Sequence, residues 1–347
     1  MSGQMADETK KNGGKVRFLS GVQPSGRLHL GNYFGALRQH IALQDEGQAF
    51  YFIANYHAMT TVQDRALLEE QTLGVALDYL ALGLDPKKAI FFRQSDVPEV
   101  AELAWVLSCV TAKGLLDRAT SYKDKVQRGI SASVGLYTYP MLMAADILIY
   151  RSHVVPVGED QIQHIEMTRD MAQAFNKAYG EVFPVPKPRL DAGAKVPGLD
   201  GQKMSKSYGN TIEIFQEGKA LRKRVMSIVT DSTPLMDPKD PGGCSVFALY
   251  RLVSSEGEQE ALAQKYRGGG FGYGEAKLML LEKINEMFGP FREERRRLEK
   301  DPGYVDSVLA QGGARARAEA QMTMKLVREA CGLGKMPVPA AEPSTAR

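Results

Sequence analysis

The sequence predicts an α/β protein, in which a parallel β-sheet flanked by helices is followed by a smaller all-helical region. Three observations predict this class. Short apolar strands alternate with amphipathic helices over the first two thirds of the 347 residues, these strands are apolar on both faces, and the chain after residue 211 is mostly helical and rich in charge. Such alternation produces parallel βαβ units, and strands that are apolar throughout fit a sheet covered on both faces.

Each element follows from a local signal. Short apolar runs indicate the strands, and apolar residues spaced three and four apart indicate the helices. The helix after the second strand's loop ends where Gly83 and the Asp85–Pro86 pair stop the periodicity. The expected strands are 16–20, 49–53, 89–92 and 154–157, and the expected helices are 31–44, 65–82 and 161–179.

Prolines and glycines in the second half divide the chain. Four prolines between residues 184 and 197 should break regular structure, and a loop rich in Gly, Lys and Ser follows at 198–210. The expected division is a disordered leader at 1–15, a sheet domain at 16–210, a helical region at 211–333 and a disordered tail at 334–347. The last helix is a candidate to pack back on the sheet domain.

Composition places the chain among ordinary globular proteins, since 44% of residues are apolar, 24% are charged and the net charge is +3. These values exclude a collagen, a coiled-coil rod and a mostly disordered chain. The three cysteines, Cys109, Cys244 and Cys331, are too far apart for a CxxC pair and are expected to be free thiols. The chain has no apolar run of membrane-spanning length and no apolar secretory signal, so we expect a cytoplasmic protein.

The segment from Ser20 to Asn32 is the first along the chain whose residues suggest a ligand-binding site. It leaves the first strand, passes three glycines and enters a helix. In a parallel sheet this crevice binds ligands, and the free N–H groups of a helix start favour a phosphate. His29 and Asn32 lie three residues apart, so both can face one ligand. The alternative is a glycine-rich strand-to-helix turn with a polar histidine, because neither a dinucleotide fingerprint nor a Walker loop is present.

A second segment, Lys203-Met204-Ser205-Lys206-Ser207, is more specific, and we call it the lysine loop. It stands between Gly201 and Gly209. A lysine carries a point charge on a long stem, which suits a migrating phosphate, and flanking glycines allow the loop to move. The alternative for a generic pair of lysines is a solvated basic loop, but the whole string argues against it.

The string His29-Leu30-Gly31-Asn32, here called the HLGN motif, and the lysine loop resemble the HIGH and KMSKS signatures of the class I aminoacyl-tRNA synthetases. Their order and separation are similar to those of the compact synthetases for tryptophan and tyrosine, and the likeness runs from about Arg17 to Gly334. Asn32 departs from HIGH at the last letter, which looks like the tryptophan branch. The resemblance implies a Rossmann-like nucleotide-binding sheet domain and a C-terminal helical domain that binds the anticodon.

The resemblance also implies a reaction. ATP activates L-tryptophan to tryptophanyl-adenylate with release of pyrophosphate, and the amino acid then passes to tRNA(Trp). The attacking carboxylate is ionised at neutral pH, so catalysis needs positioning and charge stabilisation rather than a general base. Mg²⁺ should accompany ATP, held by phosphate and water oxygens, and no structural metal is expected. The implied catalytic residues are Lys203, Lys206, Lys125, His29 and Asn32.

An ATP pocket follows from the same likeness. Asp160, in a string similar to the family's GxDQ element, is the candidate for the ribose hydroxyls, with helix capping as its alternative role. Lys125 lies in a string similar to a loop near the triphosphate, with an exposed surface charge as its alternative. The implied ATP-binding residues are Gln23, Pro24, Ser25, His29, Gly31, Asn32, Gly158, Glu159, Asp160, Val196, Lys203, Met204, Ser205, Lys206 and Ser207.

Asp146 is the candidate for amino-acid selection, because it is a lone carboxylate in an apolar run and must have a partner. An indole N–H only donates, so a tryptophan pocket needs an acceptor, although a structural ion pair is the alternative. Met143 stands where tyrosine-specific relatives carry a glutamine, and Leu19 where they carry a tyrosine, so both favour tryptophan. The implied tryptophan-binding residues are Leu19, Gly21, Tyr139, Met143, Asp146, Val155, Val157 and Gln161.

The resemblance also implies two partners, tRNA and a second copy of the chain. The basic residues Arg222, Lys223, Arg224 and Arg295–Arg297 are candidates for tRNA phosphates, although charge runs on helices are usually solvated faces. The family implies a homodimer, with apolar residues near Phe91 to Trp105 as a candidate interface. Alternatives remain a tyrosine–tRNA ligase, a synthetase paralogue that binds or regulates without charging tRNA, and another nucleotidyltransferase with a similar turn.

Overall fold

The computed structural model describes residues 15–119, 122, 127, 129, 132–158, 161–190 and 195–334. The expected leader, except Lys15, and the expected tail, except Gly334, lie outside this range. Among the described helices, none combines the length and the apolar character that crossing a membrane requires.

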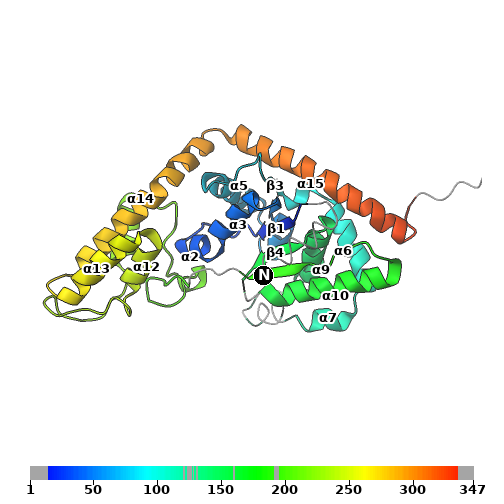
Figure 1. Ribbon diagram of the computed structural model, residues 1–347. Coiled ribbons are helices and arrows are strands. Elements are labelled where there is room, and N and C mark those ends of the chain that lie inside the picture. The colour runs from blue at the N-terminus through cyan, green and yellow to red at the C-terminus, as the bar shows by residue number, and fades with distance from the viewer. Residues whose placement is uncertain are drawn as a thin grey trace, which may run out of the picture.

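A five-stranded, fully parallel sheet forms the centre of the molecule (Figure 1). The strands are β1 (Arg17–Val22), β2 (Gln48–Ile53), β3 (Ile90–Arg93), β4 (Val154–Val157) and β5 (Lys187–Leu190), in the order β3-β2-β1-β4-β5. β1 pairs with β2 on one side and with β4 on the other, so the strand order reverses there. The four predicted strands and the predicted parallel α/β class are confirmed, and a reversal point is where such sheets bind ligands.

β5 was not expected, because the prolines of this region predicted irregular structure. Pro188 lies inside β5 and pairs in register with Val155 of β4. β5 is the last strand of the sheet and pairs with β4 alone, so only one of its edges needs backbone hydrogen bonds. A proline without an N–H group is tolerated at such an edge, which is why the sequence signal was misleading here.

Apolar side chains leave both faces of the sheet. Along β2, Tyr51 and Ile53 join one buried cluster, whereas Phe50 and Phe52 join another. Alternate residues of a strand face opposite sides, so these clusters lie on the two faces. The first face is covered by the helices after β1 and by α5 (Arg65–Ala81), and the second by α6 (Glu99–Val110), α9 (Val134–Ile149) and α10 (Ile162–Tyr179).

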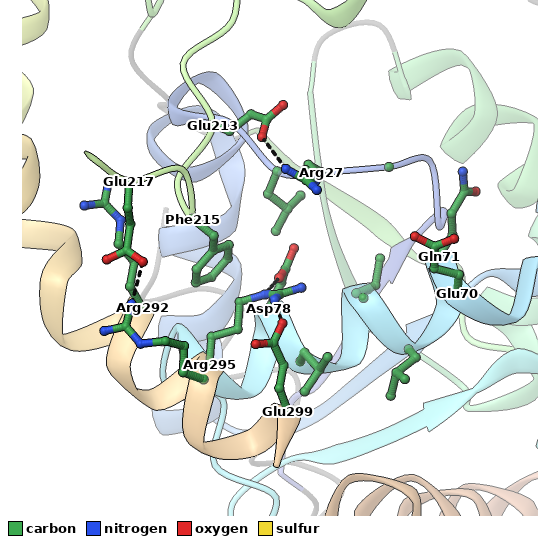
Figure 2. A pocket seen from close by; sticks show the side chains of 17 residues that line it. Arg27, Glu70, Gln71, Asp78, Glu213, Phe215, Glu217, Arg292, Arg295 and Glu299 are labelled. Atoms are coloured by element: carbon green, nitrogen blue, oxygen red, sulfur yellow. Dashed lines mark hydrogen bonds and ion pairs between the residues drawn. The ribbon is translucent and has the colours of Figure 1, made fainter. Parts of the chain in front are cut away.

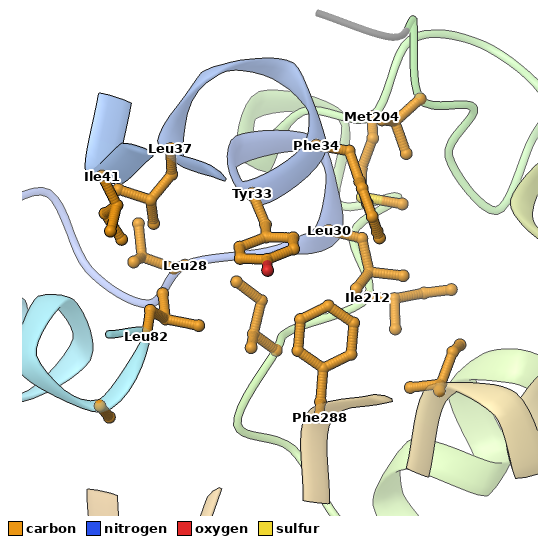
Figure 3. Packing of buried hydrophobic residues seen from close by; sticks show 14 of the residues in the cluster. Leu28, Leu30, Tyr33, Phe34, Leu37, Ile41, Leu82, Met204, Ile212 and Phe288 are labelled. Atoms are coloured by element: carbon orange, nitrogen blue, oxygen red, sulfur yellow. The ribbon is translucent and has the colours of Figure 1, made fainter. Parts of the chain in front are cut away.

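The predicted helix 31–44 is a composite. It consists of α2 (Leu30–Asn32), a π-helical stretch (Tyr33–Leu37), α3 (Arg38–Ala42) and a 3-10 turn (Leu43–Asp45). Figure 3 shows its buried side chains meeting Met204, Ile212 and Phe288. The rings of Tyr33 and Phe288 pack edge to face with centroids 5.1 Å apart. One core therefore joins the HLGN motif, the lysine loop and a helix near the end of the chain.

The second half is helical. α12 (Ser245–Val253), α13 (Glu256–Gly268) and the first part of α14 (Tyr273–Glu299) project to one side of the sheet, and α15 (Pro302–Ala330) runs back along it (Figure 1). α15 crosses β3 so closely that a Cβ on Gly312 would lie 1.7 Å from the Phe91 carbonyl oxygen. Arg17 of β1 also pairs with Glu319 of α15 at 2.9 Å. The exact domain boundaries remain predictions.

The other elements among the described residues are short. They are α4 (Asn55–Ala58), η3 (Gln94–Asp96), α7 (Lys113–Asp117), η5 (Lys206–Tyr208) and α11 (Gly218–Met226).

Candidate active site

The HLGN motif and the lysine loop are in direct contact although 173 positions separate the two contacting residues. The Gly31 N–H donates to Met204 Sδ over 3.3 Å, and Met204 is 4% exposed. A Cβ on Gly31 would lie 2.9 Å from His29 Nδ1 and 3.2 Å from Met204 Cβ. The His29 ring therefore leaves no room for a side chain at position 31, and the contact with Met204 would be tight as well.

Lys206 joins the loop to the turn before the HLGN motif. Its Nζ donates to the Ser25 carbonyl oxygen over 2.8 Å. Burial lowers the pKa of Lys206, and the nearby carboxylates of Asp78 and Glu213 partly oppose that shift. Lys203 keeps an exposed side chain at the other end of the string. Lys206 therefore lies against the turn that follows β1, whereas the backbone of Lys203 pairs with that of Pro197.

Asn210 holds the lysine loop in shape from its C-terminal side. Its Oδ1 accepts from the Ser205 N–H over 2.8 Å, and its Nδ2 donates to the Lys203 carbonyl oxygen over 3.2 Å and to Asp200 Oδ1 over 2.8 Å. Ser205 Oγ accepts from the Ser207 N–H and caps the short helix η5. These contacts fix the backbone of the loop while leaving Lys203 and Ser207 exposed.

His29 is nearly buried, with 5% of its surface exposed. Its backbone N–H donates to Asn32 Oδ1 over 3.1 Å, which fixes the start of the helix. Burial, followed by the Lys206 charge, lowers the pKa of His29 to about 4. The imidazole is therefore neutral at pH 7 and can act as a hydrogen-bonding group rather than as a cation.

A second, buried cluster surrounds Asp146 of α9. Gln94 Nε2 donates to both carboxylate oxygens over 2.9 Å, and His57 Nε2 is 2.9 Å from Oδ2. Asp146 is 2% exposed and Gln94 is 1% exposed, and burial raises the pKa of Asp146 while His57 opposes the shift. The expected partner of Asp146 thus exists. A carboxylate offers about four lone-pair sites, so one acceptor position remains for a further donor.

His57 and Gln94 were missed in the sequence. Each follows the end of a strand, β2 for His57 and β3 for Gln94, where side chains of a parallel sheet converge on the ligand crevice. The signal that could have revealed both residues is their position shortly after the apolar runs that form β2 and β3. Gln94 Oε1 also accepts from the Tyr56 N–H over 3.0 Å, so the amide links both strand ends to Asp146.

The remaining tryptophan candidates lie around this cluster. The Tyr139 hydroxyl is hydrogen-bonded to His164 Nε2 at 2.5 Å, and the Tyr139 ring lies 6.2 Å from that of His57. Met143 is partly buried, and its side chain packs on the second core cluster. Buried members of the same cluster are Leu19, Val155 and Val157.

Gly21 has a structural role that the sequence did not indicate. A Cβ at this position would lie 2.4 Å from the Phe52 ring, so the close packing of β1 on β2 already requires glycine. Gln161 lies at the start of α10, and its N–H donates to the Gly158 carbonyl oxygen over 3.0 Å. Lys125, Glu159 and Asp160 lie outside the described residues.

A cavity of about 500 Å³ lies beside the turn before the HLGN motif (Figure 2). Its walls come from Gly26–Leu28, α5, residues 213–217 and α14. Ion pairs cross this region, with Arg295 2.6 Å from Asp78 and Arg296 2.5 Å from Glu217. The cavity is thus bounded by both the sheet domain and the helical region, and much of its charge is compensated.

The structure gives several of the residues predicted to contact tRNA a partner within the chain, and their contact with tRNA stays a prediction. Arg295 and Arg296 are held by the carboxylates just described, and Arg297 pairs with Glu294 at 2.6 Å. Arg224 donates to backbone carbonyls of its own chain. The partners of Arg295 and Arg296 lie far away in the sequence, whereas Arg297 pairs with a residue one turn away on its own helix. Arg222 and Lys223 keep exposed side chains on α11.

The stretch predicted to form the dimer interface contains both buried and exposed residues. Phe91 is 1% exposed and belongs to the core, whereas Trp105 of α6 is 72% exposed. Trp105 therefore offers an exposed apolar side chain for an interface that stays a prediction.

Comparison with known proteins identifies the family of the chain. Residues 10–289 match the family described as tRNA synthetases class I (W and Y). A tryptophan–tRNA ligase of Rhodopirellula baltica is 54% identical over 92% of this chain and 100% of its own length, and one of Fusobacterium nucleatum is 54% identical over 91% of this chain and 98% of its own.

A solved structure gives the same result. The crystal structure of tryptophanyl-tRNA synthetase from Campylobacter jejuni, complexed with ADP and tryptophan, is 50% identical and superposes with a TM-score of 0.89, covering 91% of this chain and 100% of that one. The chain belongs to the class I tRNA synthetases for tryptophan and tyrosine, and within them to the tryptophan–tRNA ligases.

Proposed function

We propose that this chain activates L-tryptophan with ATP to tryptophanyl-adenylate, releases pyrophosphate and transfers the amino acid to tRNA(Trp). The observation that carries the proposal is the contact between the HLGN motif and the lysine loop at the β1 turn. It brings Lys206 and the HLGN motif to the crevice where the strand order reverses. A tyrosine–tRNA ligase is not favoured, because the relatives at 50–54% identity are tryptophan–tRNA ligases.

The chemical step needs positioned charge. The tryptophan carboxylate attacks the α-phosphorus, and negative charge grows on the leaving pyrophosphate. Lys206 and Lys203 would stabilise that charge, and the neutral imidazole of His29 would hydrogen-bond to a phosphate oxygen. The hydrogen bond from Lys206 Nζ to the Ser25 carbonyl oxygen orients the ammonium at the turn before the HLGN motif.

Selection of tryptophan rests on the buried cluster. Asp146 would accept from the indole N–H, with Gln94 and His57 holding the carboxylate in place. Met143 provides an apolar surface for the bicyclic ring. Gln161 would contact the substrate ammonium, and Asp160 the ribose of ATP.

Mg²⁺ would travel with ATP. Phosphate and water oxygens would ligate the ion, because Mg²⁺ prefers oxygen ligands and keeps several waters. The ion would neutralise phosphate charge during the step. A homodimer, binding of tRNA(Trp) along the exposed basic face of α11, and a cytoplasmic location complete the proposal.

The test is ATP–pyrophosphate exchange, run in parallel with tryptophan and with tyrosine, followed by charging of total tRNA. We expect exchange with tryptophan alone and then charging. Exchange without charging would favour a binding or regulatory paralogue. Exchange with tyrosine would overturn the role of Asp146 and Met143 in selecting tryptophan. Absence of exchange with either amino acid would overturn the proposed activity.

A further inference from the structure

Residues 209–214, here called the connecting segment, link the lysine loop to the helical region. On one side the segment pairs with the HLGN motif, since the Leu30 N–H donates to the Ile212 carbonyl oxygen over 2.9 Å and the Ile214 N–H donates to that of Leu28 over 3.0 Å. At its start stands Asn210, whose side chain fixes the lysine loop. Any displacement of this segment therefore moves both motifs.

Two arginines from the helical region hold the connecting segment. Arg224 of α11 donates from Nε to the Thr211 carbonyl oxygen over 3.0 Å and from Nη2 to that of Gly209 over 2.9 Å. Arg292 of α14 donates from Nε to the Ile214 carbonyl oxygen over 2.8 Å, and its Nη1 is anchored on Asn285 Oδ1 at 2.8 Å. Three carbonyl groups of one short segment thus depend on two guanidinium groups from another part of the chain.

The choice of arginine has a physical reason. A guanidinium is planar and presents several donors in a fixed fork, so one side chain can hold two carbonyl oxygens in a defined relative position. A lysine ammonium is a single rotating charge and imposes no such geometry. The two bonds from Arg224 therefore determine both the distance and the direction of the segment relative to α11.

We propose that Arg224 and Arg292 are positioning residues for the activation step, which hold the lysine loop at the HLGN motif by clamping the connecting segment to α11 and α14. The proposal rests on the proposed function and deepens it. It makes the orientation of α11, whose exposed face carries Arg222 and Lys223, part of the geometry that Lys206 needs. Neither arginine contacts substrate in this proposal, and both act through the segment.

Kinetics can separate this role from simple stabilisation. A reacting group displaced by about 1 Å loses on the order of 100-fold in rate. Loss of fold stability instead lowers the fraction of active molecules and leaves KM and the kcat per active site unchanged. Arg224 is only partly buried, so its substitution is the better test. Arg292 is 3% exposed, and its removal would leave buried groups unpaired.

The experiment is ATP–pyrophosphate exchange with tryptophan on the full chain carrying Arg224→Gln. We expect kcat to fall about 10- to 100-fold, with the KM for tryptophan within about twofold, because the Asp146 cluster does not touch the segment. Arg224→Lys should recover only part of the loss, since it restores charge but not the fork. Arg267→Gln removes a guanidinium that pairs with Glu260 on α13 and should leave the exchange unchanged.

A double-mutant cycle with Lys206→Ala supplies the decisive readout. If Arg224 acts through the lysine loop, its substitution should add little once Lys206 is gone, and the two losses should not multiply. Multiplying losses would overturn the proposal, as would an unchanged kcat in Arg224→Gln with a lowered melting temperature. Absence of exchange in the unsubstituted protein would instead count against the proposed function.

Discussion

The two halves of the site are built in opposite ways. The lysine loop keeps Lys203 and Ser207 exposed and is shaped by contacts to its backbone, chiefly from Asn210. The Asp146 cluster is closed, with each carboxylate oxygen bonded to a buried neighbour. The lysine loop thus comes from one short motif and keeps exposed side chains, whereas the cluster gathers buried residues from three separate elements.

The difference follows from the two tasks. A group that follows charge on a leaving phosphate gains from a loop that can adjust during the reaction. A group that distinguishes one ring system from another must already be at the correct position, which requires packing and further hydrogen bonds around it. Substitutions in the loop should therefore act on kcat, and those in the cluster on the KM for tryptophan.

The largest expected effect concerns the lysine loop. Lys206→Ala should lower kcat for pyrophosphate exchange by about 10²–10³, the usual scale for one preorganised donor. The KM for tryptophan should change little. The measurement is steady-state exchange over a range of tryptophan and ATP concentrations. A raised KM with kcat unchanged would make Lys206 a ground-state contact and remove the contrast between the halves.

Asp146→Asn tests the buried cluster around Asp146. The change preserves size but replaces an acceptor with an amide, and one hydrogen bond to a charged group is worth roughly 10- to 100-fold in binding. We therefore expect the KM for tryptophan to rise by about that factor, while the KM for ATP stays the same. Melting curves of the variant serve as the control for folding. An equal loss in the affinity for ATP would contradict the separation of the two halves.

The buried histidine of the HLGN motif gives a pH-dependent prediction. The folded-state pKa of His29 is about 4, below the ordinary 6.5, so the unfolded chain takes up a proton first as the pH falls. The stability contributed by the neutral imidazole is complete above pH 6.5 and declines towards pH 4. Between pH 7 and 5.5 the loss should be about 1 kcal/mol, in addition to changes from other groups.

Urea unfolding of the unsubstituted chain and of His29→Gln over this pH range measures that contribution. The variant should lose less stability than the unsubstituted chain between pH 7 and 5.5. Parallel curves for the two proteins would mean that His29 is protonated in the folded state, and would remove its assignment as a neutral hydrogen-bonding group.

The smallest effects concern tRNA. Arg296→Gln should change the KM for tRNA less than about twofold, because its guanidinium is paired with Glu217 and exposed pairs contribute little. Arg222→Gln should raise that KM and reduce the salt dependence of tRNA binding by about one counterion. Filter binding at several salt concentrations distinguishes them, and a larger effect for Arg296 would contradict its assignment to an internal pair.

Local patterns were sufficient for much of the site. The first four strands, the HLGN motif and the lysine loop were predicted from runs of neighbouring residues, because strand, turn and helix-start signals act over a few positions. The proline rule failed at Pro188 because it cannot tell an edge strand from an interior one. The roles of His57 and Gln94 were not visible because their contacts with Asp146 span 89 and 52 positions.

The sequence by itself determined the sheet-and-helix class and the two motifs that carry the chemistry, since periodicity and motif chemistry reside in adjacent residues. Only the tertiary structure decided which charges are free to act. Arg224, Arg295 and Arg296 look alike in the sequence, but one holds the connecting segment and two are neutralised by Asp78 and Glu217. The physical reason is that the partner of a charge is chosen by folding, which brings together groups that lie far apart along the chain.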